Sequence, residues 1–177
     1  MYVDLNTLHN PATGNSPPAT WGDQARDNFE DHETRIAALE SDVRFAAQRT
    51  TTQSIPTGAW TPIDCTTVLR DDGSDFSSPT FTVPVDDWYD FSGQVVFASN
   101  AVGVRGVGIR VNGTDFPGVL LVPAASSTGT FLAVSVNDVW LTAGNTVQLV
   151  AYHTVGAALN AAGISSQPLR FTGRAAK

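Results

Sequence analysis

The spacing of apolar side chains divides the sequence into three zones. Residues 1–20 show no apolar period and contain Pro11, Pro17 and Pro18, which favours an extended or irregular segment. The segment still carries four apolar side chains that a disordered tail would not need: Tyr2, Val3, Leu5 and Leu8. We therefore expect residues 1–20 to be an anchor that docks on another protein or on the other chains of an oligomer.

The second zone, residues 21–49, has the apolar repeat of a coiled coil. Thr20 is a suitable N-cap with Asp23 three residues later, and neither proline nor glycine interrupts residues 23–54. A helix over about 28 of these residues would extend about 40 Å at about 1.5 Å per residue. Its apolar positions alternate by four and three residues, and we call them the seam: Ala25, Phe29, His32, Ile36, Leu39, Val43 and Ala46. So narrow a stripe favours identical helices side by side, although one amphipathic helix packed on its own domain is the alternative.

The charged residues beside the seam favour a coiled coil of three helices. Arg35 and Glu40 flank Ile36 and Leu39 in a pattern that resembles the short Arg-to-Glu signature of parallel trimeric coiled coils. In that arrangement, the Arg35 stem covers the seam and its guanidinium pairs with Glu40 of a neighbouring chain. His32 would bring three imidazoles to the axis, where they would set the register or, alternatively, hold an anion or a metal.

The apolar period changes to two in the third zone, residues 50–177. Asn112-Gly113 is a strong hairpin signal at the end of one alternating run. The predicted strands are separated by Gly, Pro and Asn turns and include residues 80–83, 88–99, 105–111, 118–122, 130–136, 146–152 and 169–172. This pattern predicts an all-β sandwich or jelly roll.

Composition limits the partners of the chain. The net charge is −7 and the isoelectric point is near 4.6, which disfavours binding to nucleic acid. We find neither an apolar run of membrane-spanning length nor a signal peptide, so we expect a protein made in the cytosol. The single cysteine, Cys65, excludes an intrachain disulfide framework, and we interpret it as a buried thiol.

Catalytic and cofactor motifs are missing from the sequence. His9, His32 and His153 do not accompany a nucleophile signature, so we expect no enzyme and no cofactor; a catalytic site assembled between chains is the remaining alternative. Residues 71–75 resemble the start of a calcium loop, but Thr82 stands where the closing glutamate is required. We interpret them as a solvated turn, with a looser calcium site as the alternative, and predict no metal site.

The best candidate for a ligand-binding face combines acidic and aromatic residues. Asp86, Asp87 and Asp90 surround Trp88, a composition suited to a glycan. For the other tryptophans, Trp21, Trp60 and Trp140, packing in the core or at an interface is the expected role.

The third zone resembles a known fold family. FTVP at residues 81–84 and WYDFSG at 88–93, followed by LTAGNTVQL at 141–149, are similar to segments of C1q and tumour-necrosis-factor jelly rolls. Asn145 stands where that family usually has Asp, and Trp88 stands near its usual Gly. The resemblance covers about residues 53–174 and implies a head that packs as three copies around an axis.

The whole chain also resembles small virion proteins of tailed bacteriophages. The similar segments are NPATG at residues 10–14, ATWGDQARDN at 19–28 and VRGVGIRVNGT at 104–114. The resemblance implies a homotrimeric structural protein located in the virion, whose N-terminus joins other virion proteins and whose head is exposed and could contact a host cell-surface glycan. We favour a tail fibre or minor tail protein; a capsid head fibre or decoration protein is the alternative, and a free carbohydrate-binding module is the alternative from another class.

Overall fold

The computed structural model describes residues 26, 28–30, 32, 43–124, 129–163 and 167–176. The chain divides into two compact units, Met1–Ser41 and Asp42–Lys177. In the first unit, residues 26, 28–30 and 32 are helical with exposed side chains, including Phe29 at 67% exposure. The predicted anchor residues Tyr2, Val3, Leu5 and Leu8 lie outside the described residues, as do Ala25, Arg35, Ile36, Leu39 and Glu40.

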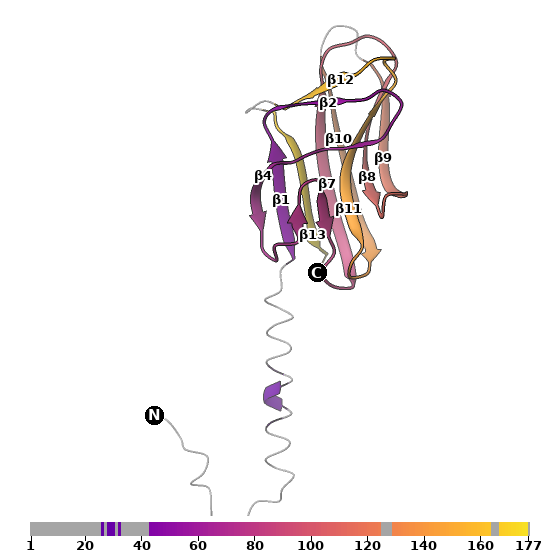
Figure 1. Cartoon of the computed structure of the whole chain (residues 1–177). Helices are drawn as coiled ribbons and strands as arrows, with labels where there is room; N and C mark the ends of the chain where they lie inside the picture. The colour runs from indigo at the N-terminus through magenta and orange to yellow at the C-terminus, as the bar shows by residue number, and fades with distance from the viewer. Residues whose placement is uncertain are drawn as a thin grey trace, which may run out of the picture. The chain divides into compact units, whose positions relative to one another are not determined.

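The second unit is a sandwich of two antiparallel sheets (Figure 1). Among the described residues, its strands are β1 (Arg44–Arg49), β2 (Thr52–Ile55), β3 (Thr61–Pro62), β4 (Thr67–Asp71), β5 (Phe76–Ser77), β6 (Thr80–Thr82), β7 (Asp87–Phe97), β8 (Val104–Val111), β9 (Asp115–Pro123), β10 (Thr130–Leu141), β11 (Thr146–His153), β12 (Leu159–Ala162) and β13 (Leu169–Ala175). Sheet A has the order β2-β12-β7-β13-β1-β4, and β10 also pairs with β7; sheet B has the order β5-β6-β11-β8-β9, and β3 pairs with β11.

Side-chain alternation accounts for the two layers. In β7 and β10, every second residue is buried over most of the strand, so each strand gives one face to the core and one to solvent. The turn predicted at Asn112-Gly113 joins β8 to β9, and both residues have positive φ (49° and 77°), as a tight two-residue hairpin turn requires. The prediction of an all-β sandwich over this part of the chain is therefore confirmed.

The predicted boundary at residue 50 is wrong. Arg44–Arg49 form β1, which pairs with β13 on one side and with β4 on the other, so the helix predicted over residues 21–49 does not include them. Two predicted seam positions change role accordingly. Val43 is buried immediately before β1, and Ala46 is half-buried within it.

Tertiary packing explains why β1 is a strand. Phe45, a residue outside the heptad, is 2% exposed, and its ring centroid lies 4.5 Å from that of Phe81, 4.8 Å from Phe171 and 5.1 Å from Phe76. A β-carbon on Gly173, its register partner, would meet the rings of Phe45 and Phe91. Burial of this ring outweighs the good helix propensity of the surrounding Ala, Gln and Arg residues.

Candidate functional site

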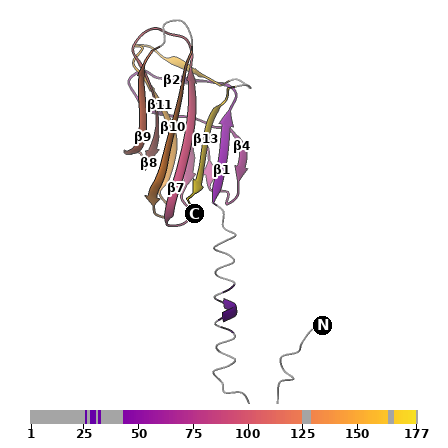
Figure 2. The same ribbon diagram turned by 180° about the vertical axis from the view of Figure 1, so that it is seen from behind.

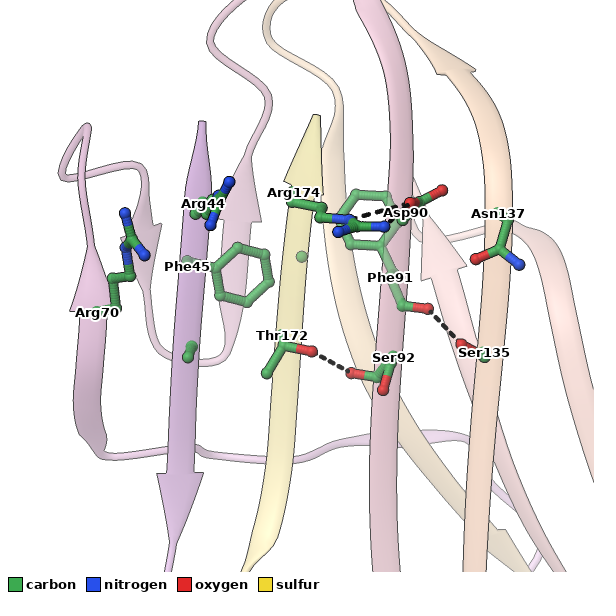
Figure 3. Close-up of a pocket in the computed structure, with 12 residues that line it drawn as sticks. Arg44, Phe45, Arg70, Asp90, Phe91, Ser92, Ser135, Asn137, Thr172 and Arg174 are labelled. Atoms are coloured by element: carbon green, nitrogen blue, oxygen red, sulfur yellow. Dashed lines mark hydrogen bonds and ion pairs between the residues drawn. The ribbon is translucent and has the colours of Figure 1, made fainter. Parts of the chain in front are cut away.

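The outer face of sheet A carries a hollow of about 350 Å³ whose lining includes several charged side chains (Figure 3). Its lining side chains come from β4, β1, β13, β7 and β10, whose alternate residues form the core. Figure 3 shows Arg70, Arg44 and Arg174 on three successive strands, with Asp90 beyond Arg174. We call this feature the arginine hollow; its lining residues are Arg44, Phe45, Ala46, Arg70, Asp90, Phe91, Ser92, Ser135, Asn137, Thr172, Gly173 and Arg174.

Two ion pairs organise the charges. Arg174 donates from Nη2 and Nε to Asp90 Oδ2, at 3.0 and 3.1 Å, and Asp90 Oδ1 accepts the backbone N–H of Asp138 at 3.2 Å. Arg70 Nη2 lies 2.7 Å from Asp72 Oδ2. The hydrogen bond from Arg70 holds the pKa of the Asp72 carboxyl below its usual range.

A second hollow of about 320 Å³ adjoins the first, because both are lined by Ser92 and Thr172. The second hollow adds Gly93, Gln94, Ala133 and Arg170. The two hollows therefore form one depression along β13 and β7. Of the described residues that line it, four are arginines and one, Asp90, is acidic.

An aromatic pair lies on the same face of sheet A. Trp88 and Trp140 are register partners on β7 and β10, with ring centroids 5.4 Å apart at 64° and exposures of 48% and 51%. Trp88 belongs to the predicted ligand face, whereas Trp140 was assigned only a packing role. The proximity of Trp140 to Trp88 depends on the register between β7 and β10, and no local pattern in the sequence indicates that register.

Two carboxylates of the predicted ligand face accept hydrogen bonds from backbone N–H groups. Asp86 Oδ1 accepts the N–H of Ala143 at 2.7 Å, and Asp87 Oδ1 accepts the N–H of Trp88 at 2.8 Å. Asp90 is engaged by Arg174. The structure therefore places Trp88 at the surface as expected, but it directs Asp90 into the arginine hollow.

A third feature is an apolar edge of the sandwich, where β9 is an edge strand of sheet B and β10 is an edge strand of sheet A (Figure 2). A hollow of about 480 Å³ there is lined by residues 114–117 and 139–141 together with Val111. Large apolar side chains that are more than one-third exposed gather on these two strands: Phe116, Val119, Leu120, Leu121, Phe131 and Trp140. We call this set the apolar edge.

The remaining polar candidates have structural roles. Asp71 accepts the backbone N–H groups of Asp75 and Phe76 at 3.0 and 3.1 Å, so its carboxylate shapes the turn. His153 is buried, with Nε2 2.8 Å from the Ile55 carbonyl oxygen, and burial raises the pKa of the Cys65 thiol to about 12. In the described part of the chain, no group of three or more His, Cys, Asp or Glu residues could hold a metal ion. The helical residues that are described include no segment long and apolar enough to cross a membrane.

Comparisons with solved structures show the fold. Murine APRIL at pH 5.0 superposes with a TM-score of 0.58 at 11% identity, covering 77% of this chain and all of that one. The Eiger TNF of S. frugiperda gives 0.52 at 8% identity, covering 77% and 93%. The globular domain of zebrafish complement 1qA gives 0.49 at 18% identity, covering 74% and 94%.

The second unit has the C1q/TNF-like jelly-roll fold. Murine APRIL and the Eiger TNF carry this conclusion, because their TM-scores exceed one half while their identities are too low to indicate function. No model of a protein family matches the sequence, and no curated protein matches it significantly. The predicted C1q/TNF-like jelly-roll fold is therefore confirmed, and it is confirmed by structural similarity without a sequence match.

Proposed function

We propose that this chain is a homotrimeric structural protein of a bacteriophage virion, in which the N-terminal segment is the attachment point and the jelly roll is the exposed head. A tail fibre or minor tail protein is the favoured role, with a capsid head fibre or decoration protein as the alternative. The observation that carries the proposal is the apolar edge, which is exposed in the single chain.

The apolar edge supports association of the heads. Six large apolar side chains on two neighbouring strands are more than one-third exposed, whereas the outer face of β13, which β7 separates from β10 in sheet A, is polar. Exposed apolar side chains that gather in this way favour burial against another protein surface. A second copy supplies such a surface with closed symmetry and without a further gene product.

The helical part of the first unit supports the same assembly. Phe29 is helical and 67% exposed, and it occupies a seam position of the predicted heptad. Because Ala25, His32, Ile36 and Leu39 continue that heptad in the sequence, three such helices would bury Phe29 at their common axis.

The virion location is supported by the N-terminal sequence. Residues 10–14 and 19–28 resemble the leading segment of small tailed-phage virion proteins. A trimer would hold three copies of residues 1–20 together, so that three weak contacts act as one strong attachment.

Light scattering tests the assembly. We expect a mass of three times 18.7 kDa for the full chain. Replacing Ile36 and Leu39 together by Asp should lower the mass, because six charges would crowd one seam. The matched variant Thr34→Asp, outside the seam, should leave the mass unchanged. A full-length monomer at micromolar concentration would refute the trimer.

Virion incorporation tests the location. Deletion of residues 1–19 should leave the mass unchanged and abolish incorporation into phage particles, measured by immunoblot of purified virions. Normal incorporation of this variant would refute the anchor, and absence of the intact protein from purified virions would refute the virion role.

A further inference from the structure

We propose that the outer face of sheet B binds a neutral saccharide, whose sugar rings stack on Trp60, Phe116 and Tyr152. We call these three residues the aromatic platform. The inference goes beyond the proposed function and concerns the single chain, so failure of the trimer or of the virion role would leave it standing. It places a glycan contact on a different face from the one that the sequence indicated around Trp88.

Two glycines of β8 form the floor of the platform. In sheet B, β8 lies between β11 and β9 (Figure 1). Gly106 and Gly108 alternate with core residues of β8, so they belong to the outer face, yet both are buried. A β-carbon on Gly106 would lie 3.0 Å from Trp60 Cη2, and one on Gly108 would lie 3.4 Å from Phe116 Cδ1. The rings therefore lie directly on the backbone of β8.

The three rings come from separate elements and pack on one another outside the core. Trp60 precedes β3, Tyr152 is on β11 and Phe116 is on β9. The ring centroid of Trp60 lies 5.1 Å from that of Tyr152 and 5.2 Å from that of Phe116. None of the three belongs to the core or to the partly buried side chains packed against it. Phe116 is 37% exposed and the other two are half-buried, so the platform is a preformed aromatic surface in contact with solvent.

The polar groups of the platform are open to a ligand. The indole N–H of Trp60 and the hydroxyl of Tyr152 have no hydrogen-bond partner among the described residues, and neither is among the buried polar atoms that lack one. Both groups therefore reach solvent. Tyrosine and tryptophan combine a large apolar ring with one polar group in this way where a binding surface is apolar at its centre and wet at its rim.

A row of polar side chains adjoins the platform. Arg110 follows Gly108 by two residues and therefore lies on the same face of β8. Arg110 Nη2 donates to Gln148 Oε1 at 2.7 Å, and Gln148 Nε2 donates to Thr80 Oγ1 at 2.9 Å. These hydrogen bonds hold the guanidinium and the amide in place beside the rings, where they can exchange hydrogen bonds with sugar hydroxyls.

The ligand class follows from these features taken together. A sugar ring presents C–H groups on its faces and hydroxyls around its edge, which matches aromatic rings bordered by hydrogen-bonding groups. Nucleic-acid bases also stack on aromatic side chains, but a net charge of −7 repels their phosphate backbone. A second copy of the chain is the other possible occupant, and the solution mass of a platform variant separates it from a saccharide.

NMR of the indole N–H groups tests the site in the full-length, 15N-labelled protein. The probes are cellotriose, lactose and triacetylchitotriose, with sorbitol as a control that has hydroxyls but no sugar ring. The indole signal of Trp60, assigned by its loss in Trp60→Phe, should shift with at least one of the three sugars and should not shift with sorbitol. Absence of a shift with all three sugars, or an equal shift with sorbitol, overturns the proposal.

Variants measured by isothermal titration calorimetry with the sugar that binds locate the contact. Trp60→Ala should weaken binding by about tenfold or more, because aromatic anchors contribute most of the affinity at such surfaces. Tyr152→Phe removes a hydroxyl that has no partner among the described residues, so it should preserve the fold and weaken binding by about threefold or more. The matched control is Trp88→Ala, a tryptophan of sheet A that is 48% exposed, which should leave the affinity unchanged.

Two outcomes overturn the proposal even if a sugar binds. Equal weakening by Trp60→Ala and Trp88→Ala would show binding without preference for the platform. Trp60, unlike Phe116, is not part of the apolar edge, so Trp60→Ala should keep the solution mass of the unmodified protein in light scattering. A lower mass would assign the platform to an interface between copies of the chain.

Discussion

Truncation of the Phe45 side chain distinguishes between the two structures that the sequence allows for residues 44–49, a coiled-coil helix and the strand β1. In the predicted heptad, Phe45 falls outside the seam and faces solvent, so Phe45→Ala would change stability by no more than about 0.5 kcal/mol. In the sandwich, Phe45 is 2% exposed and is surrounded by the rings of Phe76, Phe81, Phe91 and Phe171. Removing a buried phenyl ring costs about 3–5 kcal/mol, from lost burial and from the cavity left among the neighbours.

Urea unfolding, followed by tryptophan fluorescence at one fixed protein concentration, measures the difference. The concentration is held constant because subunit association contributes to apparent stability. Domains of ordinary stability have about 5–15 kcal/mol, so Phe45→Ala should shift the midpoint far to lower urea. The matched control is Gln48→Ala on the opposite face of β1, where the side chain is half-buried and the effect should stay below about 0.5 kcal/mol. A loss of less than 1 kcal/mol in Phe45→Ala would refute the aromatic cluster around β1.

Two further predictions concern buried polar groups. Burial raises the pKa values of Cys65 and Tyr89 to about 12 from ordinary values of 9.0 and 10.0, so their contribution to stability is full below pH 9 and is lost as pH rises toward 12. Urea midpoints across this range should fall less steeply in Tyr89→Phe, and a thiol reagent at pH 8 should label Cys65 only after unfolding; rapid labelling of the native protein would contradict its burial. The guanidinium of Arg105 donates to the carbonyl oxygens of Asn100, Val102 and Val104 at 2.8–3.0 Å in a fully buried position. Arg105→Met should lower the free energy of unfolding by about 2–3 kcal/mol and speed amide exchange at residues 100–104, and unchanged exchange there would argue against this role.

The sequence by itself determined the all-β character of the second unit. Residues 80–83, 105–111 and 146–152 alternate locally, and Asn112-Gly113 encodes its own turn, so strand formation is indicated within each segment. The C1q/TNF-like pattern at residues 81–93 and 141–149 then indicated the right jelly roll. These signals were sufficient because each lies within a few neighbouring residues.

Only the tertiary structure decided what depends on distant partners. Residues 44–49 have good helix formers and fit the heptad, yet they form β1 because Phe45 fills a space among rings supplied by β5, β6 and β13. The Trp88–Trp140 pair exists through the β7–β10 register. Arg44, Arg70 and Arg174 are far apart in sequence, and pairing of β4, β1 and β13 brings them to one hollow. Local spacing encodes whether a segment is a strand, whereas the neighbours of that strand, and hence the chemistry of the face they share, depend on the packing of the whole domain.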